Sequence, residues 1–596
     1  MRYAAVCYTM EIKFRYVYVC YILNTLCHAI KLGNPSPPKL KGAVCAYGDM
    51  NRDLYTDLLI HDGIKVKLYT QTEEGEFQST SLALEVGKSV ASCAIGDFNG
   101  DALPDILVIT NTKEHYKAVV FICTGISGSD CSPFQLDEEF LDEPGVIDVN
   151  GDGKSDLVGF AKDDQKFICR LGTEKNGVFA KCEESFEADK QPGFLKGFPI
   201  SFVDVTGDLS AEVIFAMRNG SNLVLDVWKR SSKNAWKRSV ELIKELKIEE
   251  GKYFGVPLFA DFDADGSMDI AVPVCADAPC TRVDSIWIWT NNHWLPSTIS
   301  LSNNVASSTG QLSVVFRVGD FTLDGYPDLL ALVICEGQPT PMILENTECT
   351  SCMNNETRQF TLRTTPRLIQ PSGVSLGKIR MASFFDLMED GTLDVLLEYV
   401  DVKDHRKKET TIDFIQYSDY GDTTFLKVEV FSSCTKNCGS EKIKIGSGIA
   451  WHGACVSYNM SVSRKLEQRG TQCQMPQTTH RTFYSPFTLF GLGRSPNFVD
   501  YVRIGSPRPV DASQHYGLKQ LVPNSRVIVV PPKNGASYWQ SRLYVTPSSL
   551  IIQSLIVLIS VCSSLLLIIA VLHIRERRID KQERQAQSHR FHFDAM

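Results

Sequence analysis

The sequence predicts an all-β fold: a seven-bladed β-propeller, then a smaller β-rich domain and one transmembrane helix. Three observations predict this architecture. An aspartate-rich phrase recurs seven times between Asp49 and Asp394, a short apolar run follows each copy, and one long uncharged apolar segment lies near the C-terminus. The copies are about 48 to 66 residues apart, which is the length that a blade of four short strands and their turns requires.

The chain begins with a segment that has the features of a signal peptide. Lys13 and Arg15 precede an apolar run, and a short pattern of small residues ends at Ala29, as a cleavage site requires. We therefore predict a signal peptide over residues 1–29. The alternative is a retained signal anchor, but the apolar run is too short to span a bilayer and Asn24 interrupts it.

The propeller is predicted over residues 30–410, and each repeat has the chemistry of a cation site. In the second copy, positions 1, 3, 5 and 9 carry the side-chain oxygens of Asp97, Asn99, Asp101 and Asp105. Calcium takes about six to eight oxygen ligands, and a main-chain carbonyl at position 7 would add another. Carboxylates crowded into one turn repel each other when no cation is bound. We therefore expect Ca2+ as a structural cofactor that keeps the loop closed.

The seven copies differ in how many oxygen ligands they keep. Four copies keep a full set and are expected to bind calcium, and these are Asp49, Asn51, Asp53 and Asp57; Asp97, Asn99, Asp101 and Asp105; Asp148, Asn150, Asp152 and Asp156; and Asp261, Asp263, Asp265 and Asp269. Two further candidates are weaker, namely Asp320, Asp324 and Asp328 with Thr322 at position 3, and Asp204 and Asp208 with Thr206 and Glu212.

The copy at Asp386 is degraded, because Met388 places a thioether where calcium needs an oxygen. Calcium occupancy at Asp204 and Asp386 is left open. An EF-hand is excluded, since strands and not helices are expected to follow the loops and no glutamate stands at position 12. Ion-free aspartate turns are the alternative for all seven copies.

Cysteine usage indicates a secretory compartment. Of 19 cysteines, three lie in residues 1–29 and one in the C-terminal apolar segment, which leaves 15. Close spacing predicts local disulfides for Cys123/Cys131, Cys169/Cys182, Cys275/Cys280, Cys349/Cys352, Cys434/Cys438 and Cys455/Cys473. Because 15 is odd, at least one thiol is free or pairs between chains. Cys45, Cys93 and Cys335 remain beside apolar runs, where burial explains them. Zinc is the alternative for the closest pairs, but no second pair lies at finger-like distance.

Three sequons predict a glycoprotein. N-glycosylation acceptors occur at Asn219, Asn355 and Asn459, and all three lie in the part of the chain expected outside the cell.

The C-terminal part predicts a membrane anchor. Residues 411–546 continue with alternating apolar runs and predict a membrane-proximal β-rich domain, with Gly491 and Gly493 at a tight turn. Residues 549–572 are uncharged and long enough to cross a bilayer once. Arginines follow directly, so the C-terminal side is expected in the cytoplasm, which gives a type I orientation. The tail, 573–596, has no apolar face, and we expect it to be disordered until a partner binds.

The repeated phrases, for example GDFNGDALPDILVI at 96–109, resemble the FG-GAP repeats of integrin α-subunits. With the single span and the terminal sequence HRFHFDAM at 589–596, nearly the whole chain resembles the T-cell immunomodulatory protein family, also called Linkin. Segments within 469–530 resemble the C-terminal domain of the ASPIC/UnbV family. The resemblance implies a seven-bladed propeller with calcium in its loops, and roles in cell adhesion and in modulating immune cells.

Several function classes can be weighed from the sequence. A net charge of -9 with scattered basic residues argues against nucleic-acid binding. No G-x-S-x-G or H-E-x-x-H motif is present, so we expect no enzyme, with an extracellular hydrolase as the alternative. We expect a cell-surface or extracellular protein ligand bound by propeller loops. A receptor that binds a cytosolic partner through Phe591 and Phe593 is the other alternative.

We expect the protein in the plasma membrane, with secretory or endosomal vesicles as the alternative location. The identity of the ligand, the disulfide connectivity and the oligomeric state are left open.

Overall fold

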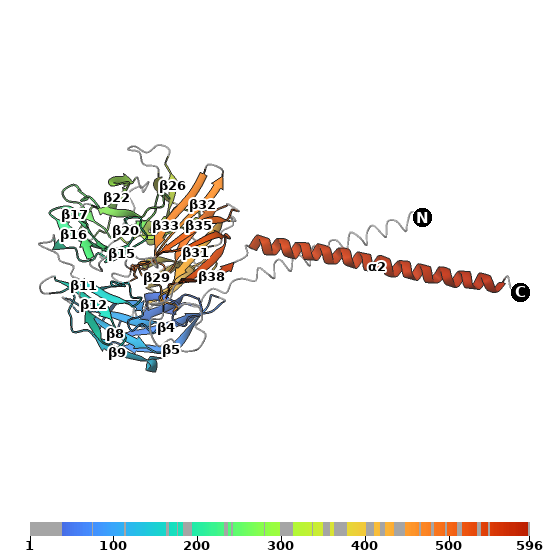
Figure 1. The fold of residues 1–596 in the computed structure, drawn as a ribbon, viewed down its shortest axis with the longest axis horizontal. Helices are drawn as coiled ribbons and strands as arrows, with labels where there is room; N and C mark the ends of the chain where they lie inside the picture. The colour runs from blue at the N-terminus through green and yellow to red at the C-terminus, as the bar shows by residue number, and fades with distance from the viewer. Residues whose placement is uncertain are drawn as a thin grey trace.

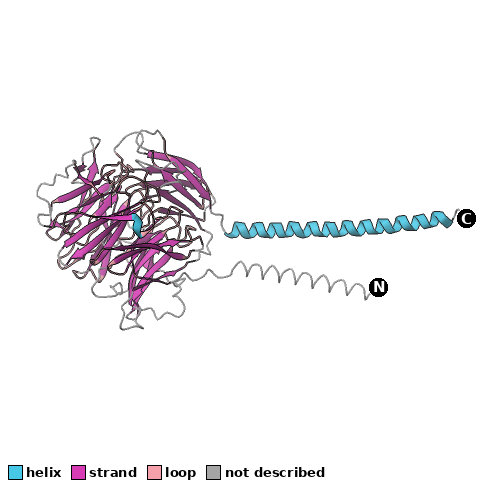
Figure 2. Ribbon diagram, turned by 90° about the horizontal axis from the view of Figure 1, so that it is seen from below, coloured by secondary structure: helices cyan, strands magenta, loops and turns pink. Residues whose placement is uncertain are grey.

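The computed structural model consists of a β-rich body from which one long helix extends (Figures 1 and 2). It describes residues 39–593 with these gaps: 74, 113–114, 163–165, 176, 183–192, 232–235, 240–241, 279, 298–313, 336–337, 350–357, 363–377, 401–409, 418–422, 434–446, 464–465, 478–481, 495–496, 509–514, 533–537 and 546–548. The predicted signal peptide, Asn355, Cys352 and the Cys434/Cys438 pair lie outside the described residues.

The predicted all-β class is confirmed. Within 40–415, the described strands form seven antiparallel sheets, which we number blades 1 to 7. Blade 1 contains β2 (Ala43–Gly48), β3 (Asp57–His61), β4 (Lys65–Gln71) and β5 (Phe77–Glu85). Blade 2 contains β6 (Val90–Gly96), β7 (Asp105–Thr112), β8 (His115–Cys123) and β9 (Cys131–Gln135). Blade 3 contains β10 (Gly145–Ile147), β11 (Asp156–Phe160), β12 (Phe167–Gly172) and β13 (Phe179–Lys181). A short 3-10 helix, Gly128–Asp130, precedes β9.

Blades 4 and 5 each contain five strands because the first strand of the sheet is split in two. Blade 4 contains β14 (Gly193–Phe194), β15 (Ser201–Val203), β16 (Glu212–Asn219), β17 (Asn222–Arg230) and β18 (Trp236–Arg238). Blade 5 contains β19 (Tyr253–Phe254), β20 (Leu258–Ala260), β21 (Asp269–Cys275), β22 (Val283–Thr290) and β23 (His293–Ser297). Blade 6 contains β24 (Arg317–Gly319), β25 (Asp328–Cys335), β26 (Gln338–Glu348) and β27 (Arg358–Leu362).

Blade 7 is completed by the strand that begins the described chain. It contains β28 (Lys378–Phe385), β29 (Asp394–Val400), β30 (Thr410–Ile415) and β1 (Leu40–Lys41). Leu40 pairs with Ile412 and Lys41 with Thr411, so the two ends of the propeller segment share one sheet. Because β30 belongs to this sheet, the propeller ends after residue 415, a few residues later than the boundary predicted between 410 and 411.

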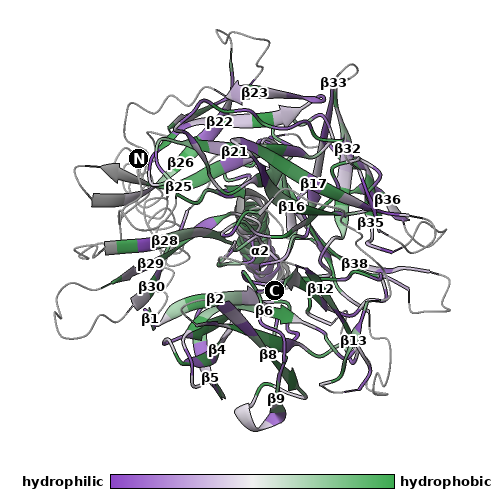
Figure 3. Ribbon diagram, turned by 90° about the vertical axis from the view of Figure 1, so that its left-hand side faces the viewer, coloured by the Kyte–Doolittle hydropathy of each residue, from purple (hydrophilic) through white to green (hydrophobic). Residues whose placement is uncertain are grey.

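The propeller core lies between neighbouring blades, whose sheets are arranged around a common centre (Figure 3). Each buried apolar cluster combines strands of adjacent sheets: Val66 of blade 1 and Val108 of blade 2 share one cluster. Leu107 of blade 2 and Leu157 of blade 3 share another. Strands that are apolar on both faces can therefore be buried here, because each sheet is covered on both sides by its neighbours.

A two-sheet β-sandwich follows the propeller. Its sheets are β31 (Thr424–Val430), β34 (Thr488–Gly493), β37 (Ser525–Val530) and β38 (Gln540–Val545); and β32 (Cys455–Ser463), β33 (Leu466–Cys473), β35 (Val499–Gly505) and β36 (His515–Leu521). One buried apolar cluster, with Val428 and Val456 among its members, lies between the two sheets. This domain occupies the region where the sequence predicts a membrane-proximal β-rich domain.

The connection from β33 to β34 packs into the propeller. Gln477 accepts a hydrogen bond at Oε1 from the main-chain N–H of Tyr47 at 3.0 Å. Thr482 accepts one at its carbonyl oxygen from Arg317 at 2.8 Å. The ring of Phe483 stacks on that of Tyr47, with centroids 5.6 Å apart. Since Tyr47 belongs to blade 1 and Arg317 to blade 6, this connection ties the sandwich to the two blades that flank blade 7.

Four of the predicted local disulfides are confirmed, and they are Cys123–Cys131, Cys169–Cys182, Cys275–Cys280 and Cys455–Cys473. Cys349 is also disulfide-bonded. The interpretation of Cys45 and Cys93 as leftover buried cysteines is incomplete. Both are buried, but they form a disulfide that links blade 1 to blade 2.

The C-terminal helix α2 (Ser549–Phe593) contains the predicted span. Its described stretch, Ser554–Gln587, is long and apolar enough to cross a membrane, and none of it is buried against the body. The expectation of a disordered tail is wrong for residues 573–593, which continue the helix. Arginine, glutamate and glutamine have high helix propensity, and Asp580 precedes Arg584 by four residues, a favourable pairing on a helix.

Candidate metal loops

All seven acidic loops have the same place in their sheets. The residue at position 1 directly follows the first strand of the pair, and the residue at position 9 begins the second strand. In blade 1 the register pairs Gly48 with Asp57, and in blade 6 it pairs Gly319 with Asp328. The loop length is therefore set by the strand register, and every copy presents its carboxylates at the same end of its sheet.

The carboxylates at positions 1 and 9 organise the loop through main-chain hydrogen bonds. In blade 2, Asp97 Oδ2 accepts from the N–H of Ala102 at 2.9 Å. Asp105 Oδ2 accepts from Phe98 and Oδ1 from Cys123, both at 2.9 Å. The bond from the N–H of position 2 recurs at the other six position 9 residues, Asp57, Asp156, Glu212, Asp269, Asp328 and Asp394. The seven loops therefore share one hydrogen-bonding scheme.

The loops also share a backbone conformation that most residues avoid. Positions 4 and 6 have positive φ in every copy: in blade 1 these are Arg52 (61°) and Leu54 (76°), and in blade 2 Gly100 (79°) and Ala102 (61°). Left-handed conformation costs a non-glycine residue roughly 1–2 kcal/mol. Such strain persists only where the surroundings impose the conformation, and it turns the side chains of positions 1, 3 and 5 toward one another.

The donor set of these loops fits a hard cation. In blades 4 and 5, three carboxylates each offer an oxygen within 4.8 Å of the others, and they are Asp204, Asp208 and Glu212, and Asp261, Asp263 and Asp265. The copy at Asp204, left open from the sequence, therefore brings its ligands together. Burial, together with repulsion by Asp101, raises the pKa of Asp97 to about 7. Burial likewise raises the pKa of Asp57 to about 8. A bound cation would offset this cost of burying charge.

Lysines contact the fifth-position carboxylate in two loops. Lys154 donates from Nζ to Asp152 at 2.5 Å, and Lys229 donates to Asp208 at 2.6 Å. The side chain of Lys229 is 39% exposed. Its Nζ also donates to Thr206 Oγ1 at 3.0 Å and lies 3.7 Å from Glu212 Oε1, so a metal ion in this loop would have to displace a partly exposed ammonium.

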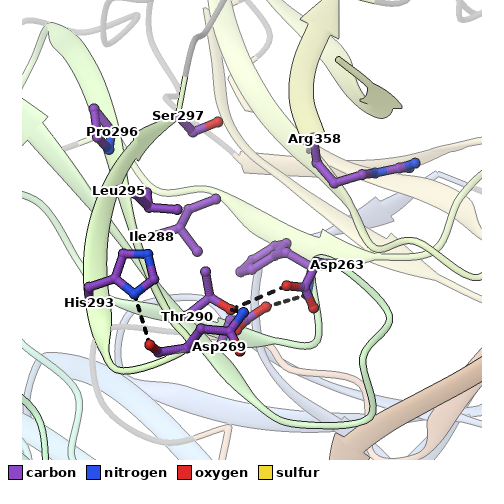
Figure 4. Close-up of a pocket in the computed structure, with 11 residues that line it drawn as sticks. Asp263, Asp269, Ile288, Thr290, His293, Leu295, Pro296, Ser297 and Arg358 are labelled. Atoms are coloured by element: carbon purple, nitrogen blue, oxygen red, sulfur yellow. Dashed lines mark hydrogen bonds between the residues drawn. The ribbon is translucent and has the colours of Figure 1, made fainter. Parts of the chain in front are cut away.

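The fifth loop opens onto a cavity of about 260 Å³ between blades 5 and 6 (Figure 4). Asp263 and Asp269 lie on one side, where Asp263 Oδ2 accepts a hydrogen bond from Thr290 at 3.2 Å. His293 and Arg358 line other parts of the wall. This loop is therefore accessible to solvent from the cavity, although the sandwich contacts it at Asp261 and Gly266.

The sandwich donates hydrogen bonds directly to position 1 aspartates. Trp451 Nε1 donates to Asp148 Oδ2 at 2.8 Å. The N–H of Thr471 donates to Asp261 Oδ2 at 3.1 Å, and that of Gly491 to Asp320 Oδ2 at 2.8 Å. The sandwich thus sits on the end of the propeller where the acidic loops lie. No local sequence pattern marks these donors, which are 171 to 303 residues from their acceptors.

The degraded seventh loop does not fit calcium. Met388 occupies position 3, and the ammonium of Lys427 from the sandwich lies 2.9 Å from Asp386 Oδ2. A cation is already provided there by the protein.

The two described sequons have different surroundings. Asn219 is exposed at the end of β16, where its Nδ2 donates to Glu245 Oε1 at 3.0 Å. Asn459 is half-buried in β32, between β33 and β35. Exposure makes Asn219 the more accessible acceptor of the two, and glycosylation at all three sequons stays a prediction.

Known proteins are similar to this chain over nearly its whole length. A model of the FG-GAP-like repeat matches residues 49–108, and one described as "ITFG1, C2 domain" matches residues 446–544. The protein linkin of Caenorhabditis elegans is 36% identical over 604 residues, covering 97% of this chain and 99% of that protein. The chain belongs to the linkin and T-cell immunomodulatory protein family. T-cell immunomodulatory proteins of mouse and human are 29% and 28% identical, each covering 93% of this chain and 92% of their own length.

The repeat model confirms the resemblance to FG-GAP repeats, and the full-length relatives confirm the resemblance to the linkin family. The sandwich of this family member corresponds to the C2 domain model, and not to the ASPIC/UnbV domain that its sequence segments resemble.

Proposed function

We propose that this member of the linkin family is a single-pass plasma membrane glycoprotein of type I orientation. Its extracellular propeller is stabilised by calcium and binds a protein ligand in cell adhesion and in modulation of T cells and other immune cells. The protein acts by binding and not as an enzyme. The names of the mammalian relatives support the immune role, and the exposed apolar helix followed by arginines supports the anchor and its orientation.

One observation carries the calcium part of the proposal: the same loop, with the same buried acids, is built repeatedly. Asp97 and Asp105 are both fully buried, yet they accept hydrogen bonds mainly from main-chain N–H groups. Two carboxylates this close repel each other strongly at low dielectric. A divalent ion between the two carboxylates would attract both of them, and would thereby hold the first and second strands of each blade together.

The ligand surface would lie on the end of the propeller opposite the sandwich. The acidic loops connect first to second strands, and the sandwich contacts several of them. The hairpins that connect second to third strands are at the other ends of the sheets. They include the β16–β17 turn at Asn219 and Asn222, and the β3–β4 turn with Ile64, which is 53% exposed. Loops held by a rigid scaffold are the usual place for binding residues.

Cell aggregation tests the proposal with the full-length chain displayed on otherwise non-adherent cells. We expect aggregation in calcium, and its loss in EGTA. Asp105→Asn should lower aggregation and remove one calcium ion per molecule in native mass spectra, because it changes a buried ligand. Asp137→Asn is the matched control, since Asp137 is exposed and outside the loops. Equal aggregation with and without calcium, at equal surface expression, would overturn the calcium-dependent role.

A further inference from the structure

The seventh loop contains a lysine where the other loops are built for a metal ion. Lys427 lies in β31, the second strand of its sheet, and its side chain is completely buried. Its Nζ donates to Asp386 Oδ2 at 2.9 Å and to Glu389 Oε2. The ring of Phe487 lies 3.9 Å from the same ammonium. Two carboxylates and an aromatic face therefore surround one positive charge.

The backbone of this loop is nevertheless the same as in the other six. Glu389 at position 4 and Gly391 at position 6 have positive φ, 52° and 80°. Asp386 accepts from the N–H groups of Asp390 and Gly391 at 3.1 Å, as position 1 does elsewhere. The seventh loop therefore has the same conformation as the others, although position 3 is Met388 and offers no oxygen ligand. Glu389, the residue at position 4, has this left-handed conformation, and its side chain accepts the hydrogen bond from Lys427.

A second layer of charges fixes this arrangement. Glu389 also accepts from Thr56 Oγ1 of blade 1 at 2.6 Å and forms an ion pair with Arg526 at 3.4 Å. Arg526 binds Glu429 through two hydrogen bonds of 2.7 and 2.8 Å. The network thus joins blade 1, blade 7 and two strands of the sandwich, and each buried charge has an opposite charge beside it.

Lys427 is more deeply buried than the lysines of blades 3 and 4. The side chains of Lys154 and Lys229 are 11% and 39% exposed, whereas those of Lys427 and its partner Asp386 are both 0% exposed. Removing the ammonium from the loop would require lifting the sandwich off blade 7. Removing one partner of a buried ion pair is strongly destabilising, because the other charge is left uncompensated.

We propose that the ammonium of Lys427 is a covalently tethered cation that fills the seventh loop in place of calcium. It attaches the sandwich to the propeller at blade 7 whether or not metal ions occupy the other loops. This inference goes beyond the proposed function and does not depend on it, because a lysine holds its loop even if no other loop binds calcium.

Counting bound calcium on the full-length chain in detergent tests the assignment. Native mass spectra at saturating calcium should give the same number of ions for wild type, Asp386→Asn and Met388→Asn. The double variant Met388→Asn/Lys427→Met restores the oxygen ligand and removes the tethered cation, so it should bind one ion more than wild type. Loss of one ion in Asp386→Asn, or gain of one in Met388→Asn alone, would overturn the proposal.

Thermal unfolding supplies an independent test. Lys427→Met should lower Tm by several degrees, and by the same amount in calcium and in EGTA. Lys519→Met, at an exposed position of the same domain, is the control and should leave Tm unchanged. Asp386→Asn/Glu389→Gln/Lys427→Met should recover most of the loss, because it removes the ammonium together with both carboxylates that it contacts, while Arg526 keeps its partner Glu429. An effect of Lys427→Met that disappears in EGTA would overturn the proposal. Failure of Asp105→Asn to lose an ion would contradict only the proposed function.

Discussion

Trp451 of the sandwich donates its indole N–H to Asp148 of blade 3, although the two residues are 303 positions apart. Both residues are 3% exposed. Asp148 is position 1 of the third acidic loop, and its Oδ2 also accepts from the N–H of Gly153 at 2.8 Å. The interface between the domains is therefore made by the same carboxylates that organise the propeller loops.

Trp451→Phe should destabilise this interface. It removes a buried donor to a carboxylate, and we expect the free energy of unfolding to fall by roughly 1–3 kcal/mol. Trp228→Phe is the matched control, since Trp228 makes a similar bond of 2.9 Å to Asp226 within blade 4. Hydrogen exchange over residues 148–156 should increase only in Trp451→Phe. Equal exchange in the two variants would contradict an interdomain role for this bond.

The stability of the metal-free protein should fall as the pH rises. Burial raises the pKa of Asp57 and Asp394 to about 8, and that of Asp320 to about 7, above their values in an unfolded chain. The folded, metal-free state therefore holds protons more tightly than the unfolded state. The contribution of these carboxyl groups to the stability of the metal-free protein is therefore complete at about pH 4 and is lost as the pH rises through about 8.

Under the proposed function, calcium would bind the ionised carboxylates and should therefore reverse this trend. We expect the Tm difference between calcium-loaded and metal-free protein to be larger at about pH 8 than at about pH 5. Differential scanning fluorimetry of the full-length chain in detergent measures both states. A metal-free protein that becomes more stable between these pH values would contradict the burial of unpaired acids in the loops.

Gly491→Ala should separate the sandwich from blade 6. A Cβ at Gly491 would lie 2.2 Å from the carbonyl carbon of Leu323 and 2.4 Å from Asp320 Oδ2. We expect a loss of roughly 1–3 kcal/mol from this overpacking. Gly493→Ala is the control: its φ is 62° but no atom lies within 4 Å, so it should cost only about 1 kcal/mol. Thermal unfolding ranks the two, and a larger loss in Gly493→Ala would contradict the close approach.

Removing the disulfide between blades should cost more than removing a local one. Cys45 and Cys93 are 48 residues apart, whereas Cys275 and Cys280 are 5 apart. In the chain-entropy model the longer loop stabilises by about 2 kcal/mol more. Denaturant unfolding of Cys45→Ala/Cys93→Ala and of Cys275→Ala/Cys280→Ala compares them. Equal losses would show that unfolded-chain entropy does not account for this bond.

The features that could be predicted from the sequence are those that depend on residues close together in the chain. The spacing of Asp97, Asn99, Asp101 and Asp105 is itself the geometry of a loop, because the strand register places positions 1 and 9 at matching ends of two strands. Close cysteine spacing predicts local disulfides for the same reason. The apolar length of the C-terminal segment likewise predicts its helix.

Contacts between distant segments could not be predicted in this way. Lys427 and Trp451 are single residues in an apolar context, and nothing nearby shows that an acidic loop will face them. Gly491 was assigned to a turn, yet it lies within β34 and only Gly493 is at the turn. Cys45 and Cys93 did carry a usable signal: both stand four residues before the first aspartate of their repeats, so equivalent positions of adjacent blades bring them together.

The pairing of β1 with β30 constrains the order in which the nascent chain can mature. Leu40 leaves the ribosome early, but its partner Ile412 follows more than three hundred residues later. At about 5–20 residues per second, that is roughly 20–75 seconds of synthesis. Until then β1 has no partner strand, and unpaired main-chain groups of a strand are prone to intermolecular pairing. The ring of blades can therefore close only after blade 7 has been synthesised, which leaves an interval in which chaperones can protect the incomplete propeller.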